Sequence, residues 1–269
     1  MFETLVAIAI LALIVYVHEI GHHAAARQLS IEVVELSLGF GKKLCQWTSP
    51  KSGTAYTLRL LPFGGYNSFL SEADLVGKHA APSSAFNVLP VWKRFVTIAA
   101  GPAANMLLAL ILSSGLWVTD QISASLTAFA DVSEGATAES TESMFILSMQ
   151  TFGEMMQVVV TSPSRAAEVI GGPIGAVWAL RDVVSKQGIC GMVNVLILSS
   201  VSVGLFNLLP LPGLDGCKLL TLLVEKIRGK KLSERVDNVY EWVCLVSISI
   251  LFCVMVYNDV SMLVQCFFG

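Results

Sequence analysis

Apolar residues are concentrated in four long runs, separated by more polar connections. Each run is close to the roughly 20 residues that a helix needs to cross the hydrocarbon core of a bilayer. The runs cover residues about 4–26, 95–118, 190–211 and 239–258. Between the first two runs, positions 31–37 and 54–61 alternate apolar and polar residues around a Lys-Ser-Gly turn, which is typical of paired strands. The pattern therefore predicts an all-α membrane protein with four transmembrane helices and a small antiparallel β element at about 31–69.

Composition supports the membrane assignment and excludes other classes. Hydrophobic residues make up 54% of the 269 residues and charged residues only 14%, with a mean hydropathy of +0.70. The net charge of −3 provides no basic surface, so nucleic acid is not an expected partner. The six cysteines form no CxxC pair and are interpreted as mostly buried thiols.

The distribution of Lys and Arg predicts the orientation of the spans. Residues 27–94 contain eight of them and residues 216–238 contain six, whereas residues 119–190 contain three and both termini contain none. Because Lys and Arg accumulate on the cytoplasmic side, the two basic loops are expected inside. Both termini and the acidic segment 119–190 are then expected on the external side.

The first span contains the sequence His18-Glu19-Ile20-Gly21-His22, an H-E-x-x-H motif. On a helix, residues four apart share a face, so the two imidazoles can bind one Zn²⁺ and Glu19 can act on water beside it. Ionisable groups inside a span cost about 2.5–3.5 kcal/mol each, and a divalent cation would compensate that cost. The alternative is that span one ends at Val17 and that these side chains are solvated.

A third zinc ligand is expected at the same depth as the two histidines, since catalytic zinc takes three protein ligands. Asp215 follows the Pro-rich end of the third run, which the charge pattern also places inside, and is the best candidate. It could instead cap the helix that begins at Gly216. Cys217 is a weaker candidate and is more simply a packed thiol.

Asn105 lies within the second run, where a buried amide needs hydrogen-bonding partners. It could join neighbouring helices, or it could hold the backbone of an unwound substrate; the two roles are compatible.

Three segments together resemble the signatures of the site-2 protease family of intramembrane zinc metalloproteases. They are His18-Glu19-x-x-His22, Gly101-x-x-x-Asn105 and Asn207-x-x-Pro210-x-Pro212-x-x-Asp215-Gly216. The similarity extends to Pro62-Phe63-Gly64-Gly65-Tyr66 and covers residues of about 1–118 and 171–260.

The resemblance implies a set of roles. His18, His22 and Asp215 would bind Zn²⁺ and Glu19 would be the general base. Substrate-binding residues would be Asn105, Gly64, Gly65, Tyr66 and Asn207, with the β element re-entering the membrane from the cytoplasmic side. The expected substrates are single-span membrane proteins, such as anti-sigma factors, or remnant signal peptides. The expected location is the bacterial inner (cytoplasmic) membrane; the oligomeric state is left open.

One difference from the family concerns the connection between spans two and three. Related proteins carry one or two PDZ domains there, whereas this chain has about 70 residues without a PDZ-like series of strands. We therefore expect two halves of a protease core, 1–118 and 171–269, joined by an acidic external connector at 119–170.

The rival hypotheses are a catalytically silent membrane adaptor and a metal-binding or metal-transporting membrane protein. An intact ligand set disfavours the first, and the scarcity of other intramembrane carboxylates and histidines disfavours the second.

Overall fold

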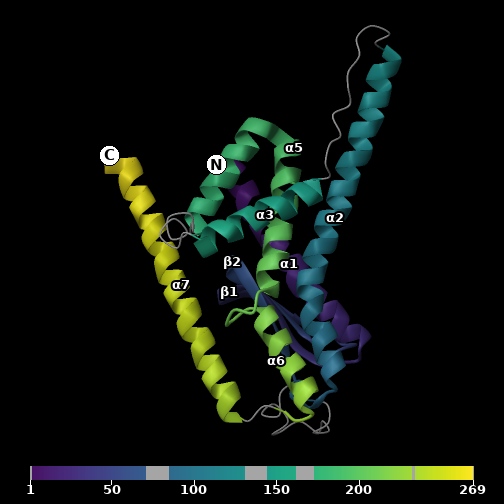
Figure 1. The fold of residues 1–269 in the computed structure, drawn as a ribbon, viewed down its shortest axis with the longest axis vertical. Coiled ribbons are helices and arrows are strands. Elements are labelled where there is room, and N and C mark those ends of the chain that lie inside the picture. The colour runs from purple at the N-terminus through teal and green to yellow at the C-terminus, as the bar shows by residue number, and fades with distance from the viewer. Residues whose placement is uncertain (1, 71–84, 131–143, 162–172, 232–233, 269) are drawn as a thin grey trace.

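The computed structural model describes residues 2–70, 85–130, 144–161, 173–231 and 234–268 (Figure 1). It is mostly helical, with one small sheet. The helices are α1 (Phe2–Gln28), α2 (Val91–Ala130), α3 (Met144–Thr161), α5 (Pro173–Leu208), α6 (Asp215–Arg228), α7 (Glu234–Phe268) and the short 3-10 helix η3 (Phe86–Val88). The strands are β1 (Val33–Thr48) and β2 (Ala55–Phe69).

Four of the described helices are long and apolar enough to cross a membrane, which confirms the predicted number of spans. The qualifying stretches are Thr4–Gln28, Val91–Leu116, Gly191–Leu208 and Trp242–Ser261. This set fits a multi-pass membrane protein.

Helices α2, α5 and α7 extend well beyond the apolar runs that predicted them. Helix α2 continues to Ala130, into the predicted connector, because no proline or glycine follows Gly115 in that stretch. Helix α5 begins at Pro173, a residue that suits a first helical turn, and joins the predicted segment 171–187 to the third span. Figure 1 shows that α5 bends sharply between its two parts. Residues 131–143 and 162–170 of the predicted connector lie outside the described residues.

The predicted β element is present as an antiparallel pair, β1 and β2. Its register is irregular: residues 35–38 of β1 have partners both in 55–58 and in 65–68 of β2. Segment 65–69 therefore pairs with β1 on one side, and the described residues provide no strand partner for its other side. A Cβ atom on Gly65 would lie 3.0 Å from Cγ of Glu19, so this segment contacts α1 near the candidate site.

Helices α1, α2 and α5 form the centre of the molecule. Small residues bring α1 and α2 together: a Cβ on Gly21 would overlap Ala100 and Ala104, and a Cβ on Gly101 would overlap the His22 ring. Ile14 of α1 packs with Val195 of α5 in one apolar cluster. Ala109 of α2 packs with Ile197 and Val201 of α5 in another cluster. Helix α7 stands apart from this centre in Figure 1.

Candidate metal centre

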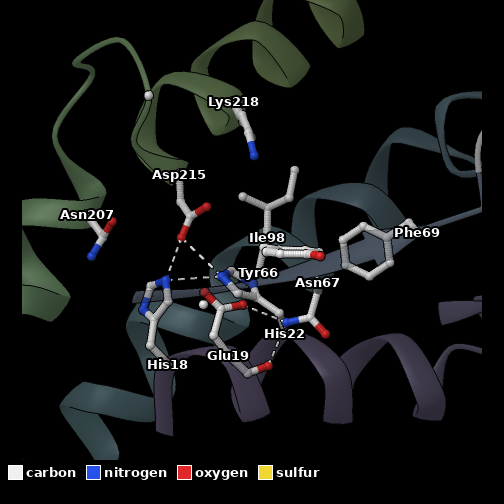
Figure 2. Close-up of a pocket in the computed structure, with 12 residues that line it drawn as sticks. His18, Glu19, His22, Tyr66, Asn67, Phe69, Ile98, Asn207, Asp215 and Lys218 are labelled. Atoms are coloured by element: carbon white, nitrogen blue, oxygen red, sulfur yellow. Dashed lines mark hydrogen bonds and ion pairs between the residues drawn. The ribbon is translucent and has the colours of Figure 1, made fainter. Parts of the chain in front are cut away.

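Helix α1 carries the first two candidate ligands on one face, one turn apart. The Nε2 atoms of His18 and His22 lie 3.1 Å apart, and both residues are 8% exposed (Figure 2). Glu19 is similarly buried, at 9% exposed. The three ionisable residues of the H-E-x-x-H motif are therefore inside the protein, and the alternative that they are solvated at a helix end is not what the fold presents.

Asp215 is brought to the histidines by the bend after α5. Pro210 and Pro212 prevent the helix from continuing, and Gly213 adopts a positive φ of 92° that suits glycine. Asp215 is then the first residue of α6, and the capping position belongs to Leu214, so Asp215 does not serve as the helix cap. Its Oδ2 lies 3.0 Å from His18 Nε2 and 3.1 Å from His22 Nε2.

The three side chains have the geometry of a metal site. A tetrahedral zinc with bonds of 2.0–2.1 Å separates its ligand atoms by about 3.3 Å, close to the observed 3.0–3.1 Å. Asp215 Oδ2 is buried and makes no hydrogen bond of proper geometry, although two nitrogens lie beside it. Among the described residues, His18, His22 and Asp215 form the only group of three or more such side chains that could hold a metal ion.

Electrostatics favour an ionised Asp215. Burial acts to raise the pKa of this carboxyl, but the adjacent imidazoles of His18 and His22 outweigh burial and hold the pKa well below its ordinary value. The carboxylate is therefore available as an anionic ligand.

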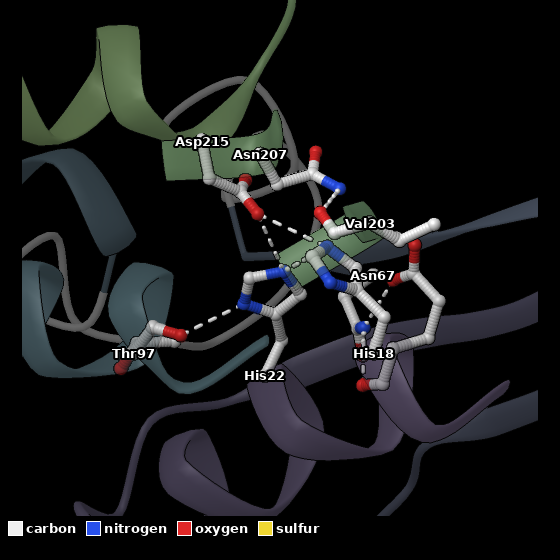
Figure 3. Close-up of polar contacts among 8 residues, drawn as sticks. His18, His22, Asn67, Thr97, Val203, Asn207 and Asp215 are labelled. Atoms are coloured by element: carbon white, nitrogen blue, oxygen red, sulfur yellow. Dashed lines mark hydrogen bonds and ion pairs between the residues drawn. The ribbon is translucent and has the colours of Figure 1, made fainter. Parts of the chain in front are cut away.

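Two further residues orient the site, and the sequence analysis named neither. His22 Nδ1 lies 2.9 Å from the backbone oxygen of Thr97, so it donates there and leaves Nε2 free to bind a metal (Figure 3). Asn67 Nδ2 donates to Glu19 Oε2 at 2.7 Å and to the Glu19 backbone oxygen at 2.9 Å. Asn67 directly follows the predicted substrate-binding segment Gly64-Gly65-Tyr66, so its nearness to the site could have been inferred from the sequence. The contact with the Thr97 carbonyl could not, because a backbone carbonyl is the same in every residue.

A pocket of about 240 Å³ opens beside these residues. It is lined by His18, Glu19, His22, Gly65, Tyr66, Asn67, Phe69, Ile98, Asn207, Gly213, Asp215 and Lys218. Gly65, Tyr66 and Asn207, three predicted substrate-binding residues, are in this lining. Gly64 is not, and it packs instead against the ring of Phe40. The Asn207 amide donates to the Val203 backbone oxygen at 2.9 Å.

Asn105 also lies away from the pocket lining. It is completely buried, and neither atom of its amide has a hydrogen-bond partner.

The Tyr66 end of the pocket is held by a polar network on the sheet. Arg59 donates from Nη2 to the Tyr66 hydroxyl at 2.7 Å and to Glu35 at 3.2 Å, and Tyr66 donates to Glu35 at 3.1 Å. Burial acts to raise the pKa of Glu35, yet the neighbouring Thr57 hydroxyl and the hydrogen bonds from Tyr66 and Arg59 bring that pKa below its ordinary value. The network fixes the pocket-facing edge of β2.

Comparison with known proteins places this arrangement in a family. The model of Peptidase family M50 matches residues 6–253, so the chain belongs to that family of metallopeptidases. The resemblance to site-2 proteases is thereby confirmed.

Several relatives bear the name "Putative zinc metalloprotease". One from Agrobacterium fabrum is 26% identical, with 96% of this chain and 95% of the relative covered. One from Rickettsia conorii is 25% identical, covering 93% and 96%. One from Xylella fastidiosa is 39% identical over 107 residues, which are 40% of this chain and 23% of that protein.

Zinc is the cofactor of this family, and the cluster of His18, His22 and Asp215 could hold it. The alignment to the Agrobacterium protein extends over 361 positions, more than the 269 residues of this chain. The relative therefore contains segments that have no counterpart here.

Proposed function

We propose that this protein is an intramembrane zinc endopeptidase that cleaves single-span membrane proteins or remnant signal peptides. One observation carries the proposal: two histidines, a distant aspartate and a buried glutamate meet at one pocket at the ends of apolar spans. His18, His22 and Asp215 would hold the metal. A silent adaptor would have no need for Glu19 to line the same pocket.

Glu19 is the proposed general base. Zinc, when bound, polarises a carbonyl oxygen and lowers the pKa of water. The Glu19 carboxylate accepts the proton of the attacking water and then passes it to the nitrogen of the leaving amine. Asn67 donates to Oε2 and to the backbone of Glu19, so it holds the carboxylate in place while the second oxygen stays available for the proton.

The substrate would be bound as a strand. Segment 65–69 pairs with β1 on one side only, and Gly65 and Tyr66 line the pocket beside Glu19. An unwound substrate segment could pair with this edge through backbone hydrogen bonds, which is the usual way in which a sheet edge binds an extended peptide. The missing side chain of Gly65 lets Glu19 lie directly against this segment, while Gly64 packs against the Phe40 ring. Asn207 would contact the substrate from the α5 side of the pocket.

The proposal includes a topology. The basic loops 27–94 and 216–238 would face the cytoplasm, which puts the site near the inner surface of the bacterial inner membrane and both termini outside. In this arrangement the β element enters the membrane from the cytoplasmic side. The short acidic connector would stand where relatives of this type have PDZ domains, so substrate size would be filtered by another device or not at all.

The test compares Glu19→Gln with Glu32→Gln, a matched carboxyl-to-amide change at an exposed position outside the pocket. Both variants and the parent are reconstituted in vesicles with a single-span substrate. Glu19→Gln is expected to retain zinc and to lose at least about 100-fold in cleavage rate, and Glu32→Gln to behave like the parent. Undiminished cleavage by Glu19→Gln contradicts the role of Glu19. If the parent protein binds zinc but cleaves no protein of the membrane proteome, the silent-adaptor hypothesis is favoured.

A further inference from the structure

The centre of the molecule contains a set of buried polar atoms without partners. They are His18 Nδ1, both amide atoms of Asn105 and Ser200 Oγ. His18 is 8% exposed, and Asn105 and Ser200 are completely buried. Buried polar groups are almost always hydrogen-bonded, so each unpaired group in a native protein calls for an explanation. Here the unpaired atoms come from three helices that pack together.

The crossing of α1 and α2 brings Asn105 to the level of His18. Lys93 reaches the Leu29 backbone oxygen, His22 reaches that of Thr97, and Gly21 meets Ala104, so α1 and α2 run antiparallel. Gly101 lies directly against the His22 ring. One helical turn back along α1 leads from His22 to His18, and one turn forward along α2 leads from Gly101 to Asn105. Both steps go in the same direction in space.

Helix α5 packs against α2 beside the crossing of α1 and α2. Gly204 lies against Pro102 and Met106, and Ile197 and Val201 pack with Ala109. Ser200 is three residues after Ile197 and four before Gly204, so it is on the same face of α5 and points toward α2. Two orphaned groups, the Asn105 amide and the Ser200 hydroxyl, are thus directed into one helix junction.

His18 needs a partner that His22 already has. For its Nε2 to bind zinc through a lone pair, the ring must carry its proton on Nδ1, and ligand histidines are normally fixed in that tautomer by an acceptor for the Nδ1 proton. In His22 this acceptor is the Thr97 backbone oxygen at 2.9 Å. No backbone oxygen or carboxylate of the described residues accepts from His18 Nδ1.

We infer that Asn105 is the positioning residue for His18, with its amide oxygen accepting the Nδ1 proton and its amide NH₂ donating to Ser200. A small side-chain rotation or one bridging water would complete these contacts. The inference rests on the proposed function, since it takes His18 as a zinc ligand. It differs from the predicted role of Asn105 in binding substrate, since Asn105 is fully buried and does not line the pocket.

The test measures zinc affinity and stability separately in purified full-length protein. Asn105→Leu keeps the branched shape and the number of side-chain heavy atoms but removes the acceptor, and is expected to raise the zinc dissociation constant about 10–100-fold, measured by chelator competition. The thermal midpoint of the metal-free protein should stay unchanged or rise, because an unpaired buried amide is replaced by an apolar group of similar shape. Asn105→Asp restores an acceptor and should bind zinc within about threefold of the parent. Met106→Leu, a volume-conserving neighbour on α2, is the packing control and should change neither value.

The outcomes separate the hypotheses. Unchanged zinc affinity in Asn105→Leu, or a loss of metal-free stability alone, overturns the positioning role and leaves Asn105 as a structural residue. Failure of the parent itself to bind zinc overturns the proposed function instead. If Asn105→Leu does not fold, Asn105→Ala is measured by the same criterion: at least tenfold weaker zinc binding than Asn105→Asp supports the inference, and equal affinity overturns it.

Discussion

The crossing of α1 and α2 and the helix α7 are equally apolar but are built in opposite ways. At the crossing, glycines and alanines allow the backbones to approach closely, and polar side chains are buried between them. Helix α7 exposes large side chains along its described length, such as Trp242, Ile250 and Tyr257. The Gly175 backbone nitrogen of α5 donates to Asp259 Oδ1 of α7 at 3.0 Å.

The two regions differ because one contains a metal site and the other faces lipid. Lipid tails are as apolar as leucine, so a helix that faces lipid needs only length and hydropathy. A metal site needs its ligand atoms fixed within fractions of an ångström, which requires close backbones and satisfied polar groups. Substitutions should therefore be costly at the crossing and almost neutral on α7.

The largest effect is expected at Gly101. A Cβ there would overlap the His22 ring. The ring cannot move freely, because its Nδ1 is hydrogen-bonded to the Thr97 backbone oxygen and its Nε2 faces Asp215. Gly101→Ala should therefore lower zinc affinity at least about 100-fold and abolish cleavage. Zinc content after purification and cleavage of a reconstituted substrate measure both effects.

The matched control for Gly101 lies on the same helix. A Cβ on Gly115 would meet nothing within 4 Å, so Gly115→Ala should preserve zinc and stabilise α2 by about 0.5–1 kcal/mol. If both alanine variants bind zinc like the parent, the packing at the crossing does not set the geometry of the site.

This contrast also explains which features of the fold and the site could be predicted from the sequence. The H-E-x-x-H spacing predicted that His18 and His22 share a helix face, and the charge pattern predicted that Asp215 lies at their depth. Both follow from local periodicity and composition. The contact from Asn67 to Glu19 and that from His22 to the Thr97 carbonyl depend on tertiary packing, and a backbone carbonyl has no residue identity to reveal it. Helix α2 also extends beyond its apolar run, because no proline or glycine follows Gly115, and α5 is continuous although Gly188 and Gly191 lie within it.

A second, smaller effect concerns the docking of α6, which supplies Asp215. Arg94 Nη2 of α2 donates to Glu225 Oε2 of α6 at 2.7 Å, with the two side chains 9% and 10% exposed. Removing one partner of a buried pair leaves an uncompensated charge, so Arg94→Met should lower the free energy of unfolding by about 3 kcal/mol. It should also weaken zinc binding, since α6 carries a ligand. Denaturant titration in detergent measures the first effect.

The double variant Arg94→Met/Glu225→Leu is the control, because it replaces the whole pair by apolar groups of similar size. It should recover most of the lost stability. If the double variant is as unstable as Arg94→Met, packing of the Arg94 side chain, and not its charge, holds α6.

The smallest effect is expected on α7, tested by the same truncation in both regions. Ile197 on α5 is completely buried, whereas Ile250 on α7 is 60% exposed. In a membrane both side chains stay in apolar surroundings when the helices separate, so truncation costs chiefly the packing lost around a cavity. Ile197→Ala should then cost about 1–2 kcal/mol and Ile250→Ala less than about 0.5 kcal/mol, compared by thermal unfolding in one lipid mixture. Equal losses of stability in the two variants would mean that another surface covers Ile250 in the membrane. The contrast between α7 and the helix crossing would then hold only for the isolated chain.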